Sequence, residues 1–258
     1  MSLFLSSLPL WITAFLLVVV PTVAACCALI LIRRHVGLER LTTNNEVAGF
    51  KFAVVGVLYA VLLAFAIIVV WQRYTDAEVA VVHEAGAAAT LYRLGAGPEP
   101  EARQLRAALA AYLALVTERE WPQMARERES AEANRALDAL YGAALHLAQT
   151  APRQSAVLMP IFNQIDLITE ARRSRLHLAI GVMPAVLWAA LLLGGFLTVS
   201  FTFFFGTENL TAQVMMTGIL AIIVFMGLFV IVSIDHPFTG PVRVDPDPLL
   251  RVLTDFPS

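Results

Sequence analysis

The residues of this sequence that could do chemistry are few, and the two most informative lie in one apolar stretch. Within residues 47–71, Lys51 is the only charged residue and Tyr59 is the only hydroxyl-bearing one. At about 100° per residue, both fall on one side of a helix. Four more residues share that side: Val55, Leu62, Ala66 and Val70. An amine and a phenol that face a water-filled path would attract ions.

Both residues also have purely structural explanations, which the sequence leaves open. A charge at the bilayer centre costs roughly 2.5–3.5 kcal/mol on insertion scales. Lys51 lies about one turn inside the stretch, so its amine could snorkel to the interface and avoid most of that cost. Tyr59 could equally be buried, with its hydroxyl bonded to a neighbouring helix.

A second side of the same helix carries small residues, namely Gly49, Ala53, Gly56 and Ala60. Lipid gives helices no hydrophobic reason to associate, so close approach through small side chains is what holds them together. We therefore expect these four positions to pack against other helices, while the side that carries Lys51 faces the path.

A central pore in a homo-oligomer would use these residues as follows. Lys51, with Arg33, Arg34 and Arg40 nearby, would stand at the outer mouth, and Arg73 would stand at the inner end. Leu62, Ala66 and Val70 would form an apolar constriction that can gate by dewetting. Rings of basic side chains concentrate anions, so this scheme favours an anion, with chloride as the candidate permeant ion.

Other reactive side chains form no recognisable site. The five histidines are scattered, and none is spaced from another His or a Cys as metal ligands are. No Gly-rich phosphate loop, nucleophile elbow or pair of catalytic carboxylates occurs. We therefore expect no enzymatic activity, no cofactor and no metal. The mixed charges around Trp121 and Pro122 are typical of a solvated loop, with a subunit contact as the alternative.

Composition places all of these residues in a membrane protein. Hydrophobic residues make up 59% of the chain and charged residues only 15%, with a mean hydropathy of +0.73. Soluble domains average about half and about a quarter, respectively. The net charge of −2 gives no basic field for nucleic acid. Four stretches are long enough to cross about 30 Å of hydrocarbon, at residues 8–32, 47–71, 178–205 and 210–234.

Between the second and third spans the pattern changes to amphipathic helix. Apolar residues recur every three or four positions in three runs that begin at Leu105, Leu137 and Leu158. We expect an all-α protein in which residues 1–71 hold two spans, 72–177 a helical domain, 178–234 a hairpin of two spans, and 235–258 a tail. The second span should continue unbroken past Gln72, and the helix that starts near Pro152 should run straight into the third span.

Arginines near the span ends set the expected orientation. Five lie on the side of the helical domain and both termini, and three lie opposite. The five are Arg73, Arg172, Arg173, Arg175 and Arg243. The positive-inside rule therefore favours an inner (plasma) membrane protein whose domain and termini are cytoplasmic.

The sequence also resembles the bestrophin-like domain family of bacterial membrane proteins. The resemblance covers nearly the whole chain and rests on the order and spacing of short motifs. These are Asn45, Gly49, Gly56, Tyr59 and Phe65; Glu84-Ala85; Glu120-Trp121-Pro122; Arg172 with Arg175-Leu176; Trp188; and the turn from His236 to Gly240.

The resemblance implies an architecture. Bestrophins are four-span pentamers in which the second helix lines the pore and cytosolic helices extend the pore. The resemblance therefore implies a homo-pentamer in a lipid bilayer. Two departures stand out. Only Asp245 and Asp247 lie where animal bestrophins carry an acidic calcium-binding run, and the residues expected at the constriction are not the usual apolar-aromatic repeat. The alternative is a non-conducting membrane sensor or scaffold that acts through its cytoplasmic helices.

Overall fold

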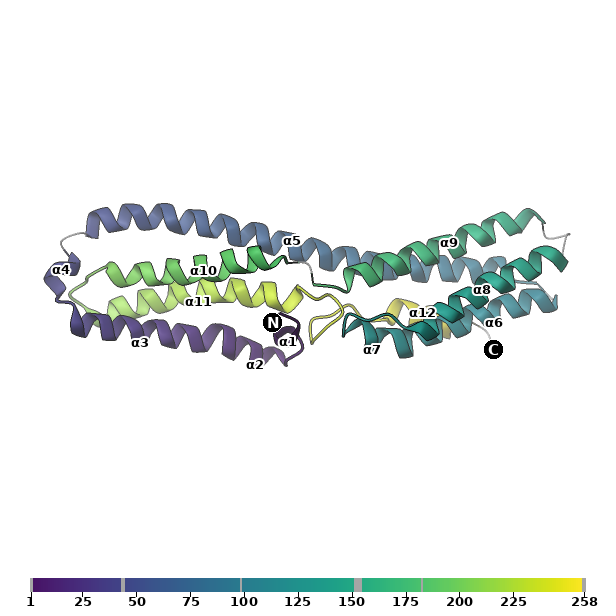
Figure 1. Cartoon of the computed structure of the whole chain (residues 1–258), viewed down its shortest axis with the longest axis horizontal. Coiled ribbons are helices and arrows are strands. Elements are labelled where there is room, and N and C mark those ends of the chain that lie inside the picture. The colour runs from purple at the N-terminus through teal and green to yellow at the C-terminus, as the bar shows by residue number, and fades with distance from the viewer. Residues whose placement is uncertain (1, 43–44, 98, 151–154, 182, 257–258) are drawn as a thin grey trace. The chain divides into compact units, whose positions relative to one another are not determined.

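The structure is a computed structural model, and it describes residues 2–42, 45–97, 99–150, 155–181 and 183–256. Within these residues every regular element is a helix, as expected from the sequence. The described part of the chain divides into two compact units (Figure 1). Unit 1 comprises residues 1–72 and 182–235, and unit 2 comprises residues 73–181 and 236–258.

Unit 1 contains four helices that are long and apolar enough to cross a membrane. The first runs over residues 10–35 as α2 (Leu10–Ala14), the π-helix η1 (Phe15–Val19) and α3 (Val20–His35), after the short α1 (Ser2–Ser6). The second is the first half of α5 (Asn45–Leu94), which follows α4 (Leu38–Thr42). The third is α10 (Ala185–Phe201) with the 3-10 turn η4 (Thr202–Phe204), and the fourth is α11 (Leu210–Ile234).

The π-helical turn in the first span has a local cause. Pro21 has no N–H to donate to the carbonyl four residues earlier, and its ring crowds that carbonyl. The helix widens over Phe15–Val19, directly before Pro21. The kink that a proline usually causes in a helix is thus replaced by a single wide turn, and the span continues through it.

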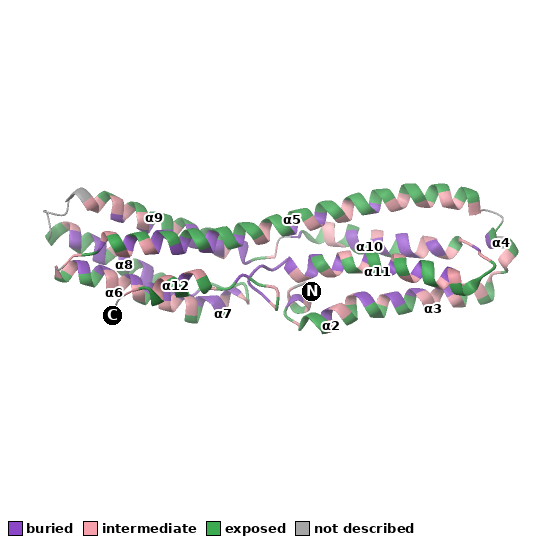
Figure 2. Cartoon of the chain, turned by 180° about the vertical axis from the view of Figure 1, so that it is seen from behind, coloured by how far each residue is buried: buried purple, intermediate pink, exposed green. Residues whose placement is uncertain are grey.

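Unit 2 is built from the second half of α5, α6 (Pro100–Leu115), the π-turn η2 (Val116–Glu120), α7 (Trp121–Met124), α8 (Ala131–Thr150) and α9 (Ser155–Leu178). The three apolar runs expected from the sequence form its core. Leu105, Leu140 and Ile165, one from each run, are all at most 1% exposed. Figure 2 shows these helices with buried and exposed faces alternating along each.

Where the helices begin and end agrees with the sequence at some positions and differs at others. α5 does continue unbroken past Gln72, but α9 ends at Leu178 and α10 begins only at Ala185, so the third span is shorter than expected. Pro184 explains the break, since the residue before a proline is disfavoured in helix and Pro184 itself stands at the N-cap of α10. Pro122 occupies the first turn of α7, where a proline is tolerated because it needs no N–H donor there. Pro152 lies outside the described residues.

The tail after the fourth span is part of unit 2. It crosses the unit and ends in α12 (Asp247–Thr254), whose Leu249 is fully buried. The indole Nε1–H of Trp121 donates to the Val244 carbonyl oxygen at 3.2 Å, and the rings of Tyr92 and Phe256 stack with centroids 3.8 Å apart. The tail is therefore packed into the core of this unit.

Candidate functional site

Tyr59 lies inside unit 1. It is 6% exposed, and its hydroxyl donates to the Leu191 carbonyl oxygen of α10 at 3.2 Å. Its ring fits against Gly194 and Gly195, where an added Cβ would come within 2.8 Å of the tyrosine. The structural alternative, a buried tyrosine bonded to a neighbouring helix, is the one that the structure has.

The other residues that the sequence predicts to face the path differ in how far they are buried. Ala66 and Val70 are buried like Tyr59, Val55 and Leu62 are half-buried, and only Lys51 is exposed. The helical wheel grouped these residues correctly, but most of that face meets the chain's own residues. The reason is that Gly194 and Gly195 of α10 leave room for an aromatic ring, and the Tyr59 ring of α5 fills that room.

The four small residues of α5 do not mediate packing inside unit 1. Ala53 and Ala60 are exposed, Gly56 has nothing within 4 Å of an added Cβ, and Gly49 has only a Phe205 ring carbon at 3.9 Å. The close helix approaches come from other glycines, on α10 and at Gly227 of α11, which receives Leu63. The small-residue face is thus left open to other molecules.

The most exposed part of α5 within unit 1 is an apolar stripe at helical spacing, which we call the open stripe. Its residues are Phe50, Val54, Val57, Val61, Phe65 and Ile68, each between 48% and 75% exposed. On the wheel the stripe lies nearly opposite Tyr59. Only 17% of the most apolar window of α5 is buried, against 22% to 28% in the other three spans, so α5 is the span least covered by its own chain (Figure 2).

The arginines expected near the ends of the path differ in their exposure and hydrogen bonding. Arg33 is half-buried, and its Nη2 donates to the Thr207 carbonyl oxygen at 2.6 Å, which ties the end of α3 to the loop before α11. Arg34 is exposed, whereas Arg73 is half-buried. The side chain of Arg40 is outside the described ones. Arg33 is therefore a structural residue, while Arg34 is available to solvent.

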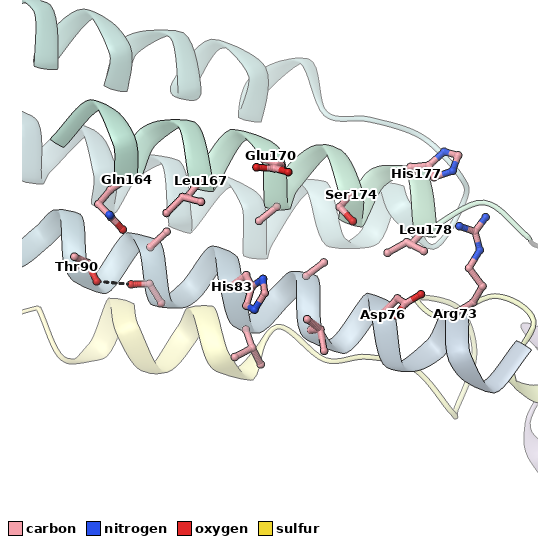
Figure 3. Close-up of a pocket in the computed structure, with 16 residues that line it drawn as sticks. Arg73, Asp76, His83, Thr90, Gln164, Leu167, Glu170, Ser174, His177 and Leu178 are labelled. Carbon is pink, nitrogen blue, oxygen red and sulfur yellow. Dashed lines mark hydrogen bonds between the residues drawn. The ribbon is translucent and has the colours of Figure 1, made fainter. Parts of the chain in front are cut away.

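In unit 2, α5 and α9 border an open groove of about 910 Å³ (Figure 3). Arg73, Asp76, His83 and Thr90 line it from α5. Gln164, Glu170, Ser174 and His177 face them from α9. The groove therefore presents charges of both signs among apolar side chains such as Val82 and Leu167. Across the described residues, no three His, Cys, Asp or Glu side chains gather closely enough to hold a metal ion.

Beneath this surface, unit 2 contains a buried network of charges. The Arg175 guanidinium, 0% exposed, donates to Glu84 Oε2 at 2.7 Å and to Glu120 Oε2 at 2.9 Å. Arg172 donates to both oxygens of Glu120, at 3.0 and 2.5 Å. Tyr112 completes it by donating to Glu84 Oε1 at 2.6 Å. Two cations and two carboxylates balance, and they join α5, η2 and α9.

The electrostatics of the network follow from this pairing. Burial alone would raise the pKa of Glu120, but hydrogen bonds from Arg172 and the charges of Arg175 and Arg172 outweigh it and hold that pKa below its ordinary value. Burial, followed by the charge of Glu84, raises the pKa of Tyr112 well above its ordinary value. Arg175 also lies 5.0 Å from the Trp121 ring, a cation–π contact. At neutral pH these shifts keep Glu120 ionised and Tyr112 neutral.

Sequence reasoning missed this network. It assigned Glu120 to a solvated loop and used Arg172 and Arg175 only to infer orientation, whereas Glu120 is 0% exposed and the two arginines are at most 5% exposed. A signal was present: Arg172 and Arg175 continue the apolar spacing of Ile161, Ile165 and Ile168 on α9. Charges placed on the buried stripe of a helix indicate partners inside the protein. Three of the motifs that carry the family resemblance meet here: Glu84-Ala85, Glu120-Trp121-Pro122, and Arg172 with Arg175-Leu176.

Comparisons with known proteins agree with this architecture. The model of the family described as "Bestrophin-like domain" matches residues 19–249. A mutant of a bacterial bestrophin homolog from Klebsiella pneumoniae is 14% identical, with a TM-score of 0.69 over 91% of this chain and 98% of that one. A second mutant of that homolog is 15% identical, with a TM-score of 0.70 over 95% and 97%. A structure described only as a membrane protein is 14% identical, with a TM-score of 0.71 over 92% and 98%. No curated protein matches the chain. At these identities the structural likeness establishes the fold.

Proposed function

Because this chain belongs to the bestrophin-like domain family, we propose that it is the subunit of a homo-oligomeric ion channel whose pore is lined by the membrane half of α5. The observation that carries the proposal is the open stripe. The span that is least covered by its own chain has the largest surface free to meet other copies of the chain or to stand at an axis between them.

The lining residues are proposed from exposure instead of polarity. Val54, Val57 and Val61 lie in the middle of the open stripe, with Phe50 and Phe65 toward its ends. An apolar ring of such side chains can close a pore to ions by expelling water. Tyr59, Ala66 and Val70 would then hold α5 in place from behind.

Anions are the proposed permeant ions, with chloride as the candidate. Lys51 and Arg73 flank the apolar span of α5, and no charged residue lies between them. In an oligomer each residue is repeated in every copy, so the two positions would form basic rings that attract anions and repel cations. The resemblance implies five copies.

We expect purified protein in planar bilayers to carry current, with a reversal potential in a chloride gradient that shows a preference for anions. Lys51→Glu should move that reversal potential toward the cation equilibrium potential, because it reverses the charge of one ring. The charge-neutral Lys51→Gln should shift it less. Absence of current above background, over varied ions and voltages, would reject conduction.

One observation favours a second candidate, a non-conducting sensor or scaffold. The open stripe bears no polar side chain from Phe50 to Ile68, and such a surface can equally pack against apolar neighbours with no water between. In that case the polar groove of unit 2 would be the functional surface. A pull-down that returns a stoichiometric partner, together with absent current, would favour this candidate.

The proposed orientation keeps unit 2 and both termini in the cytoplasm. Pairing with Glu84 and Glu120 neutralises two of the five arginines on which this orientation rests, so it needs a direct test. We expect a C-terminal green fluorescent protein fusion to be fluorescent in bacteria and a C-terminal alkaline phosphatase fusion to be inactive. The opposite pair of results would place unit 2 outside.

A further inference from the structure

The loop that connects α10 to α11 in unit 1 (Figure 1) borders a second pocket. This pocket measures about 370 Å³. The loop that borders it is held firmly. The Asn45 side chain donates to the Gly206 carbonyl oxygen at 2.7 Å and accepts from the Gly206 N–H at 3.1 Å. Nε2 of Gln213 donates to the Phe205 carbonyl oxygen at 2.5 Å. The pocket is therefore bounded by ordered polar groups.

Two buried polar atoms, one on a residue that lines the pocket and one on a residue beside it, are left without partners among the described residues. Oε1 of Gln213 accepts no hydrogen bond, although the residue is only 2% exposed. Nη1 of Arg33 donates none, while Nη2 of the same guanidinium binds the carbonyl oxygen of Thr207, which lines the pocket. Leaving a buried polar group unpaired costs about 1–3 kcal/mol, so such groups in a folded protein indicate a missing partner.

The lining of the pocket is polar at the loop and mostly apolar deeper, where the hydroxyls of Thr202 and Thr217 are already hydrogen-bonded. Thr207 and Gln213 lie in the loop and the first turn of α11, whereas Leu220 lies about 10 Å deeper at 1.5 Å per residue. Phe52 and Met216 line the apolar part, and Met216 is 55% exposed, so that part is open at the side. This gradient fits an amphiphile whose head lies at the helix ends and whose tail points into the bilayer.

We propose that this pocket binds a bilayer phospholipid with a primary-amine headgroup. The ammonium donates to Gln213 Oε1 after a small rotation of the side-chain amide, and the phosphate accepts from Arg33 Nη1. One acyl chain lies along Phe52, Met216 and Leu220. The unpaired acceptor selects the amine, because a quaternary choline headgroup has no N–H to donate. The site is independent of the proposed pore lining, since none of its residues belongs to the open stripe.

The test is native mass spectrometry of the full-length protein released from nanodiscs that contain phosphatidylethanolamine and phosphatidylcholine with identical acyl chains. We expect retention of phosphatidylethanolamine over phosphatidylcholine by about tenfold, the ratio that one charge-assisted hydrogen bond provides. Gln213→Leu should reduce the ratio to about one. Arg33→Gln should weaken retention of both lipids while keeping the ratio.

Gln164→Leu is the matched control, because it makes the same change in unit 2, and it should leave the ratio unchanged. Equal retention of the two lipids by the unmodified protein would overturn the proposal, as would a Gln213→Leu protein of normal helical content that keeps the preference. If Gln213→Leu does not fold, Leu220→Trp decides the matter. Filling the apolar part must then lower retention of both lipids, and unchanged retention would refute the site.

Discussion

The Arg175→Met protein should lose about 3–5 kcal/mol of the free energy of unfolding of unit 2, the largest effect that we expect from a single substitution. Methionine has a similar volume but no charge, so the buried Glu84 carboxyl loses its cationic partner and keeps the hydrogen bond from Tyr112. Glu120 would keep Arg172, and the loss should therefore be concentrated where α5 meets α9. Hydrogen exchange of the full-length protein in detergent should show faster exchange in unit 2.

The matched control for this change is Arg243→Met. Arg243 pairs with Asp245 at 3.2 Å, but both side chains are more than half exposed, so the pair is worth at most about 1 kcal/mol. Arg243→Met should exchange like the unmodified protein. Equal protection of unit 2 in the Arg175→Met protein would mean that the network does not stabilise the fold.

The second large effect is expected at Gly194. An added methyl group would lie 2.8 Å from Cδ2 and 3.0 Å from Cε2 of the Tyr59 ring, and the ring cannot yield because its hydroxyl is bonded to α10 itself. Overpacking of this kind costs typically about 1–3 kcal/mol. We expect Gly194→Ala to lower the midpoint of thermal unfolding in detergent, with α5 displaced from α10.

Two further variants make the Gly194 result specific. Gly56→Ala adds the same methyl group to α5 where nothing lies within 4 Å, so unit 1 should tolerate it. Tyr59→Leu combined with Gly194→Ala should recover part of the stability that Gly194→Ala loses, because the clash is removed, and such recovery is the sign of direct contact. Additive losses in the double variant would contradict the packing described here.

The sequence alone predicted the helices well and their neighbours poorly. The fourth span was expected at residues 210–234 and is α11 over the same residues, because its apolar run is long and ends in the Asp235-His236-Pro237 stop. The apolar runs of unit 2 are buried as the spacing indicates. Helical periodicity depends on local residues only, so it can be read without knowing which helix lies beside which.

The sequence could not show what each helical face would contact. For Tyr59 the sequence left both a water-filled path and burial against a neighbouring helix open, because the glycines that receive its ring are about 135 positions later in the chain. The buried network of charges was missed for the same reason. Glu84, Glu120 and Arg175 become partners only when three helices pack together. Polarity on a helical wheel shows which residues share a face, and only tertiary contacts decide what that face meets.

The central claim, that the open stripe of α5 lines an ion path, is tested most directly by cysteine accessibility during current recording. In a protein whose native Cys26 and Cys27 are replaced by alanine, Val57→Cys places a thiol on the stripe and Leu63→Cys places one against Gly227. We predict that a negatively charged thiol reagent added to open channels reduces the current of Val57→Cys and leaves that of Leu63→Cys unchanged. Modification of Leu63→Cys with Val57→Cys unaffected would contradict the account.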